Sequence, residues 1–192
     1  FDPLGLHADR STPIPSDVWT TADSTTVTGL RPDGAFSGFD EAFRLLDGFG
    51  LIAPMVAPFN WVVDPASLDG TAGSSDAPRL FLLDVDGLGV PSASDFASRL
   101  VPIEKTVAQT GTALVFPFRR VVAMRPRAPL EPGHRYAMVV TSCVADAEGR
   151  GMRADDVFAA LRNGEAIDPG LAPARADLEP VLTWLEDPSI GL

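Results

Sequence analysis

The sequence predicts a mainly β protein built as a β-sandwich, and three observations lead to this prediction. The 192 residues include 17 glycines and 18 prolines, and this density of turn formers favours many short strands over long helices. Apolar residues make up 45% of the chain, which is ordinary for a globular protein with one core. Between residues 51 and 152 the apolar residues recur mainly with the period of two that strands require.

The chain divides into three parts by these patterns. Residues 1–50 are rich in Pro, Ser, Thr, Asp and Gly, which predicts an extended segment with one short helix over 37–48. Residues 51–152 are expected to form the sandwich. Residues 153–192 return to a helical period, which predicts helices there. Because the sequence stops at Leu192 soon after an amphipathic helix and without a capping tail, we expect these helices to be a junction to a further domain.

Several strands are expected in sequence order within the sandwich. FNWVVDPASL places Phe59, Trp61 and Val63 on one face. RLFLLDVDG is apolar on both faces, as expected for a central strand. Three further strands are expected in VPIEKTVAQ, TALVFPF and RRVVAM, and Pro117 in the second of these indicates an edge strand or a bulge.

The stretch LEPGHRYAMVVTSCVADAEGRGM, residues 130–152, predicts a turn, a strand and a second turn. The Pro-Gly pair forms the first turn, and the strand is expected from Tyr136 to about residue 144. Tyr136 has the spacing of a tyrosine corner, in which the hydroxyl bonds to the backbone a few residues upstream. In the second turn, Gly149 and Gly151 are expected to supply positive φ angles.

Cys143, the only cysteine, has two possible roles. In a reactive site it would be a nucleophile with His134 as its base. In a purely structural role it would be a small core residue. We favour the structural role, because free cysteine is among the most buried residue types and the sequence identifies no acidic partner for His134.

Two helices are expected after the sandwich. In ADDVFAALRNG, Asp155 and Asp156 stand at the start, where negative charge is favourable, and Gly164 follows the end. In RADLEPVLTWLED, apolar residues spaced at i, i+3, i+4 and i+7 make one face. If Asp177 is the N-cap of this helix, Pro180 falls in the first turn, where no intrahelical donor is lost.

The charge of the chain limits its partners. The net charge of −11 would repel nucleic acid and anionic membrane surfaces, so neither is expected as a partner. No apolar run approaches the roughly 20 residues that span a bilayer, so direct membrane insertion is not expected either. A single cysteine excludes an internal disulfide and a metal site made of several cysteines.

The motifs of common catalytic sites are missing from the sequence. There is no G-x-S-x-G nucleophile motif, phosphate-binding loop, dinucleotide fingerprint or H-E-x-x-H motif. A Ser-His-Asp triad would have to use His7 or His134, and serine pairs such as Ser74–Ser75 stand outside any such motif. We therefore expect no catalytic, cofactor-binding or metal-ligating residue in this chain, and no cofactor.

Two acidic clusters carry an alternative interpretation. Asp84 and Asp86 in LDVDGLG have the spacing that begins a calcium loop, but no Glu stands at the twelfth position, so a solvated turn is expected. Asp146 and Glu148 are expected to lie in a turn for the same reason.

Among the tryptophans, Trp61 and Trp184 occupy apolar-periodic positions and are expected in the core. Trp19, in loop-like sequence, is the candidate for an exposed docking aromatic.

Three stretches carry a resemblance to a known family. LEPGHRYAMVVTSCVADAEGRGM resembles the closing hairpin of bacterial Ig-like domains of the SbsA type and, more loosely, of fibronectin type III domains. PMVAPFNWVVDPASLDG resembles the opening strands of the same modules. PIPSDVWT, followed by TGLRPDG, is similar to the start of bacterial exported proteins that place such a module before an α/β-hydrolase domain, as in extracellular and surface-anchored lipases. The resemblance covers residues 10–190.

The resemblance implies an Ig-like sandwich and a non-catalytic accessory module of an exported esterase or lipase. Such a protein would be periplasmic, anchored at the outer surface or extracellular, and its α/β-hydrolase domain would lie beyond Leu192. The resemblance assigns no catalytic residue to this chain. Two alternatives remain open. The first is a cell-surface binding or structural module, similar to an adhesin or S-layer domain, which would use Trp19 or an acidic patch at Asp84 and Asp86. The second is a small hydrolase centred on a histidine.

Overall fold

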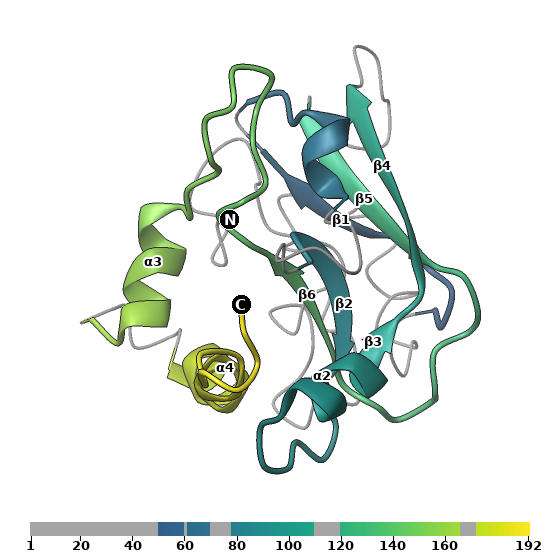
Figure 1. Cartoon of the computed structure of the whole chain (residues 1–192), viewed down its shortest axis with the longest axis vertical. Coiled ribbons are helices and arrows are strands. Elements are labelled where there is room, and N and C mark those ends of the chain that lie inside the picture. The colour runs from purple at the N-terminus through teal and green to yellow at the C-terminus, as the bar shows by residue number, and fades with distance from the viewer. Residues whose placement is uncertain (1–49, 60, 70–77, 110–119, 166–171) are drawn as a thin grey trace, which may run out of the picture.

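The computed structural model describes residues 50–59, 61–69, 78–109, 120–165 and 172–192. Within these ranges the chain is mainly β, with two small antiparallel sheets and three α-helices (Figure 1). One sheet has the strand order β1-β5-β4 and the other has the order β3-β2-β6. The strands are β1 Met55–Pro58, β2 Leu80–Asp84, β3 Leu100–Val101, β4 Ile103–Gln109, β5 Arg120–Pro126 and β6 Tyr136–Val140. The helices are α2 Ala93–Arg99, α3 Asp156–Asn163 and α4 Ala172–Leu185, with a short 3-10 helix, η3, at Pro65–Leu68.

Several predictions concern residues outside the described ranges. These are the helix over 37–48, the strand TALVFPF with Pro117, and the residues His7, Trp19, Ser74 and Ser75. They stay predictions.

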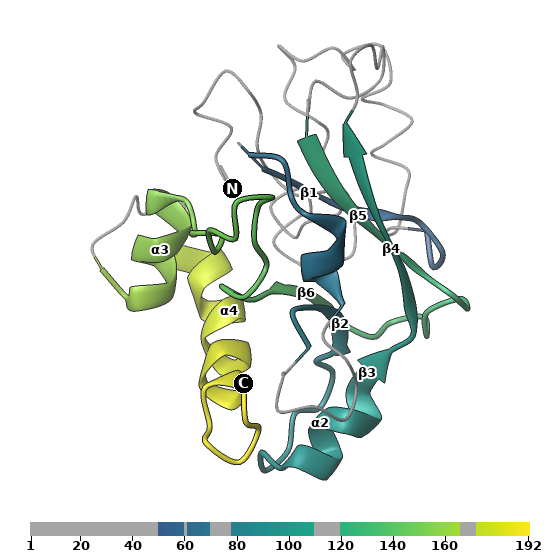
Figure 2. The same cartoon turned by 45° about the horizontal axis from the view of Figure 1, so that its top comes forward.

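The strand β2 is buried on both faces, as its apolar sequence predicts. Leu80 and Leu82 pack in one cluster with Val122 and Met124 of β5, which belongs to the other sheet. Phe81 and Leu83 pack in a second cluster on the opposite face, with side chains of α2, α4 and the segment after α4. Figure 2 shows β2 lying between the β1-β5-β4 sheet and α4. Each fully buried side chain of this size stabilises the fold by about 1.5–3 kcal/mol.

The β1-β5-β4 sheet has one buried face. Along β5 the exposed Arg125 alternates with the fully buried Val122 and Met124, which is the period of two expected from RRVVAM. On β4, Lys105 lies at the edge of the core, and its Nζ donates to the carbonyl oxygen of Leu68 at 2.7 Å. The single lysine therefore ties η3 to the sheet.

The strand expected over Phe59, Trp61 and Val63 is wrong in its position. The strand β1 ends at Pro58, and the chain bends before Val63, which pairs with Asp146 in an isolated bridge. The next turn is fixed by Asp64, whose side chain accepts a hydrogen bond from the N–H of Ala66 at 3.0 Å and caps η3. Trp61 is consequently 59% exposed, which corrects its prediction as a core residue.

The sequence patterns did not predict α2. Ser92 caps this helix by accepting the N–H of Asp95 at 3.1 Å, and Asp95 pairs with Arg99 at 2.9 Å. Only Phe96 among its seven residues is buried. A helix with a single buried side chain leaves no apolar periodicity, although the S-x-x-D pattern at its start was a usable signal.

Both C-terminal helices form as predicted from the sequence, but the second begins earlier than predicted. The helix α3 begins at Asp156, and Gly164 follows its end at φ +71°, as predicted. The helix α4 begins at Ala172, so Pro180 lies inside the helix and Asp177 is not its N-cap. The loss of one backbone hydrogen bond at Pro180 is tolerated, because Val181 and Trp184 are buried on the following turn. None of the described helices combines the length and hydrophobicity required to cross a bilayer.

Gly149 and Gly151 are required for different reasons. Gly149 has φ +79°, as predicted for the turn. Gly151 is not among the glycines with positive φ, so that part of the prediction is wrong. A Cβ at Gly151 would instead lie 2.6 Å from the carbonyl oxygen of Ser142, so the constraint there is space.

We expect Gly151→Ala to destabilise the protein by about 1–3 kcal/mol, because the added methyl group overlaps backbone that cannot rotate away. The measurement is the urea midpoint of unfolding. Gly89→Ala is the matched control, since a Cβ there meets nothing within 4 Å, and its effect should stay within about 0.5 kcal/mol. Equal midpoints for the two variants would contradict the close approach at Gly151.

Candidate functional site

A surface groove of about 270 Å³ adjoins the tyrosine at the start of β6. Apolar residues of the segments 100–102 and 128–130 line it, together with the polar or charged residues Asp84, Ser98, Arg99, Glu131 and Tyr136. Its lining residues therefore supply apolar contact, two carboxylates, two hydroxyl groups and one guanidinium. Among the described residues, no three His, Cys, Asp or Glu side chains are arranged to hold a metal ion.

Tyr136 forms the predicted tyrosine corner. Its hydroxyl oxygen accepts the N–H of Glu131 at 2.9 Å, which fixes the turn that precedes β6. Burial raises the pKa of Tyr136; the hydrogen bond from the Glu131 backbone lowers it, and the nearby carboxylates of Asp84, Glu131 and Asp86 raise it further. The net effect is a raised pKa, so the hydroxyl keeps its proton at neutral pH.

His134 has acidic partners that the sequence did not identify. Its Nδ1 lies 2.8 Å from Oδ2 of Asp84, and its Nε2 lies 3.2 Å from Oε2 of Glu131. Its ring stacks on Tyr136 with 6.3 Å between centroids. Asp84 is 50 residues away in the chain and is brought to His134 only by the pairing of β2 with β6, whereas Glu131 stood three residues upstream and was a usable signal.

The environment of His134 favours its charged form. The hydrogen bond with Asp84 raises the pKa of the imidazole, burial lowers it, and the charges of Asp84, Glu131 and Asp86 raise it again. The result is a raised pKa. Because both ring nitrogens face carboxylates, the imidazolium donates through both and leaves no lone pair to act as a general base.

Cys143 is exposed, so its prediction as a core residue is wrong. The strand β6 ends at Val140 rather than near residue 144, and the turn that follows places Val144 in the core instead. Cys143 and His134 lie beyond opposite ends of β6, whose five residues span roughly 17 Å. The two residues therefore do not form a nucleophile–base pair.

The LDVDG segment is a turn, as expected. Oδ1 of Asp84 accepts the N–H of Asp86 at 2.9 Å, and Gly87 has φ +55°. Arg99 of α2 closes the turn by donating to the carbonyl oxygens of Asp86 at 2.8 Å and Gly87 at 3.0 Å. Both carboxylate oxygens of Asp84 are thus engaged by protein donors.

Asp146 organises the second acidic turn. Its Oδ1 accepts the N–H groups of Glu148 at 3.1 Å and Arg150 at 2.9 Å, and its Oδ2 accepts Nε of Arg150 at 2.6 Å. Burial raises the pKa of Asp146, but the hydrogen bonds and the charge of Arg150, with the N–H of Glu148, outweigh burial and lower the pKa. The predicted solvated turn is confirmed in position, although the Asp146 side chain itself is buried.

Trp61 and Trp184 have different environments. Trp61 is exposed, and the guanidinium of Arg150 lies 4.7 Å from the centre of its ring. Trp184 is buried, as predicted, and packs against Phe96 with 6.2 Å between ring centroids. Its indole N–H is buried without a hydrogen-bond partner among the described residues.

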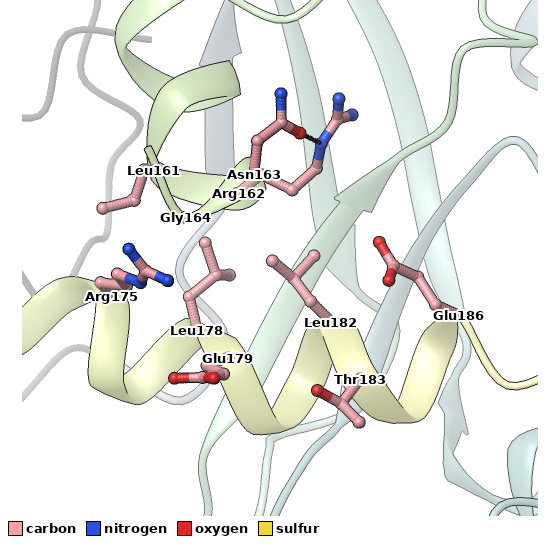
Figure 3. Close-up of a pocket in the computed structure, with 10 residues that line it drawn as sticks. All are labelled: Leu161, Arg162, Asn163, Gly164, Arg175, Leu178, Glu179, Leu182, Thr183 and Glu186. Atoms are coloured by element: carbon pink, nitrogen blue, oxygen red, sulfur yellow. Dashed lines mark hydrogen bonds between the residues drawn. The ribbon is translucent and has the colours of Figure 1, made fainter. Parts of the chain in front are cut away.

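A smaller hollow of about 150 Å³ lies between α3 and α4. Figure 3 shows Leu178 and Leu182 directed from α4 toward the end of α3. Charged side chains of both signs, Arg162, Arg175, Glu179 and Glu186, line the rest of it (Figure 3). The groove beside Tyr136 is larger, and two of its lining carboxylates, Asp84 and Glu131, contact His134, so it is the better candidate site.

We expect native Cys143 to react with a thiol reagent without denaturant, because its side chain is exposed. The measurement is the labelling rate of the folded protein compared with that of the unfolded protein. Cys143→Ser should abolish labelling and leave the unfolding midpoint unchanged. If labelling required denaturant, the Cys143 side chain would be buried, and its exposed position would be contradicted.

We expect Asp146→Asn to lower the melting temperature at neutral pH and to flatten its dependence on acid. Because the pKa of Asp146 is lowered from 3.8, its contribution to stability is present above that value and is lost as pH falls through the lowered pKa. The measurement is the melting temperature at pH values from about 7 to about 2, an interval that includes the ordinary pKa values of carboxyl groups. Glu148→Gln, at an exposed carboxylate of the same turn, is the control, and identical profiles for both variants and the wild type would contradict the assignment.

Comparison of the chain with known proteins finds no matching family model, no matching curated protein and no matching solved structure. Inference about function therefore depends on the contacts of this chain and on the short motifs in its sequence.

Proposed function

We propose that the chain is a non-catalytic accessory module of an exported bacterial esterase or lipase. In this proposal it has an Ig-like sandwich at residues 51–152, and it positions or shields an α/β-hydrolase domain of the same polypeptide. The module acts through a fixed interface. It contributes no catalytic group of its own.

The observation that carries the proposal is the anchoring of the segment after α4. Ile190 is buried in the cluster that contains Phe81 and Trp184. The hydroxyl of Ser189 donates to the carbonyl oxygen of Pro91 at 3.0 Å, and Asp187 accepts the N–H of Ser189 at 2.9 Å. A polypeptide that continues from this segment leaves the module in a fixed direction, which is what a positioning role requires.

Apolar surface beside this anchor supports an interface there. Val90, next to Pro91 in the chain, is 88% exposed, and Leu192 is also exposed. An exposed apolar side chain alone is ordinary on a protein surface. Beside a segment that is itself anchored, however, it provides apolar area that a neighbouring domain can cover.

The Ig-like part of the proposal is supported by packing. Each of the two sheets contributes one face to a shared cluster, and the tyrosine corner stands at the start of β6. The buried Ser67 of the DPASL motif lies 2.7 Å from the carbonyl oxygen of Asp64 and accepts the N–H of Ala145 at 3.0 Å. It thereby connects two of the three stretches that carry the resemblance.

A surface-binding module is the second candidate, and the exposure of Trp61 favours it. An exposed indole with a guanidinium over its ring is a platform that a binding partner can use. This alternative requires no attached enzyme. The two candidates therefore differ in what the native polypeptide contains.

The test begins with the intact mass of the native polypeptide. We expect a mass several tens of kDa above 20.3 kDa and hydrolysis of a p-nitrophenyl ester, and a mass near 20.3 kDa would overturn the proposal. In the full polypeptide, Val90→Asp should lower the calorimetric transition temperature of the hydrolase domain, since it places a charge in the proposed interface. Ile52→Asp, at another exposed apolar residue, is the control and should leave that transition unchanged. Equal effects of the two variants would contradict an interface at Val90.

A further inference from the structure

His134 connects three parts of the chain beside the groove. Asp84 ends β2, Glu131 begins the turn before β6, and Tyr136 begins β6. The imidazole contacts both carboxylates, at 2.8 Å and 3.2 Å, and stacks on the tyrosine ring. All three of its partners also line the groove. A change at His134 therefore acts directly on the lining of the groove.

The charged groups that surround the imidazole ring of His134 are mainly carboxylates. Asp84 and Glu131 contact it, and Asp86 contributes a further negative charge. Arg99 also lines the groove, but it is engaged with Asp95 and with the carbonyl oxygens of the LDVDG turn, and Arg135 pairs with Asp177 of α4 at 3.2 Å. Both guanidinium groups are thus committed elsewhere, and protonated His134 supplies the positive charge between the carboxylates.

Protonation decides how many bonds the imidazole makes. An imidazolium has two N–H donors, one for each carboxylate. A neutral ring has one N–H, and its other nitrogen then presents a lone pair to a carboxylate oxygen. The contact with Asp84 is the shorter of the two, and the Asp84 side chain is 23% exposed against 74% for Glu131. When the imidazole of His134 loses its proton, its contact with Glu131 is therefore the one that breaks first.

We propose that His134 is a pH-operated latch, which when protonated holds the Glu131 turn against the end of β2 and when neutral releases this side of the groove. The hydrogen bond that Glu131 donates to the Tyr136 hydroxyl lies in the same turn and loosens with it. This inference concerns the groove of this chain and does not depend on an attached hydrolase.

The direction of the pH dependence follows from the contacts. The hydrogen bond with Asp84 raises the pKa of His134 above its ordinary value of 6.5. The stabilisation by the latch is therefore complete below about pH 6.5 and is lost as pH rises through the raised pKa. The latch is therefore closed below about pH 6.5 and opens as the pH rises through the raised pKa of His134.

The test combines an NMR titration with amide hydrogen exchange on the protein. We expect His134 to titrate above 6.5, with a several-fold loss of protection at the amide of Glu131 over the same pH interval, beyond the intrinsic increase in exchange. The amide of Gly149, which donates to the carbonyl oxygen of Asp146 in the turn that follows the other end of β6, is the internal control and should show only the intrinsic increase.

Two variants complete the test. His134→Gln identifies the His134 resonance, since the chain has only two histidines, and should remove the pH step at Glu131. Glu131→Gln keeps the turn but removes one charge, and should shift the His134 titration to lower pH. Titration of His134 at or below 6.5, or exchange at Glu131 that follows Gly149 throughout, would overturn the latch, and both can be read from the wild-type protein alone.

Discussion

The burial of β2 on both faces is the constraint on which the other elements depend. Leu80 and Leu82 require the β1-β5-β4 sheet on one side, and Phe81 and Leu83 require the helical cover on the other. A single sheet could satisfy only one of these faces, because successive side chains of a strand point in opposite directions. The anchoring of α4 and of the segment after it is thus a consequence of four consecutive apolar residues in β2.

Polar groups secure the edges of this core. Asp84 and Asp146 each accept backbone N–H groups of their own turn and also engage a cationic side chain, His134 in one case and Arg150 in the other. Such carboxylates fix turns at the ends of strands without occupying the core. The difference lies in the cation. Arginine stays charged at any physiological pH, whereas histidine does not, and so of these two turns only the one beside the groove has a cation that can lose its charge in the physiological range.

The same geometry limits what the groove can do. Its histidine is engaged at both nitrogens, and the exposed cysteine lies beyond the other end of β6. The proposed attachment beside Trp184 and Ile190 and the proposed pH response at Tyr136 are compatible, because the two sets of residues pack on different faces of the β3-β2-β6 sheet.

The sequence by itself determined the elements whose signal is local. These include the two-sided β2, the alternation in β5, the turn before Tyr136 and the end of α3 at Gly164. Only the tertiary structure decided the environments of Trp61, Cys143 and His134, because each depends on where a strand ends or on a partner distant in the chain. Cys143 is exposed because β6 ends at Val140. His134 contacts Asp84 because strand pairing brings together residues that are 50 positions apart in the chain. Periodicity reports which residues can share a face, but burial and ion pairing are set by what packs against that face.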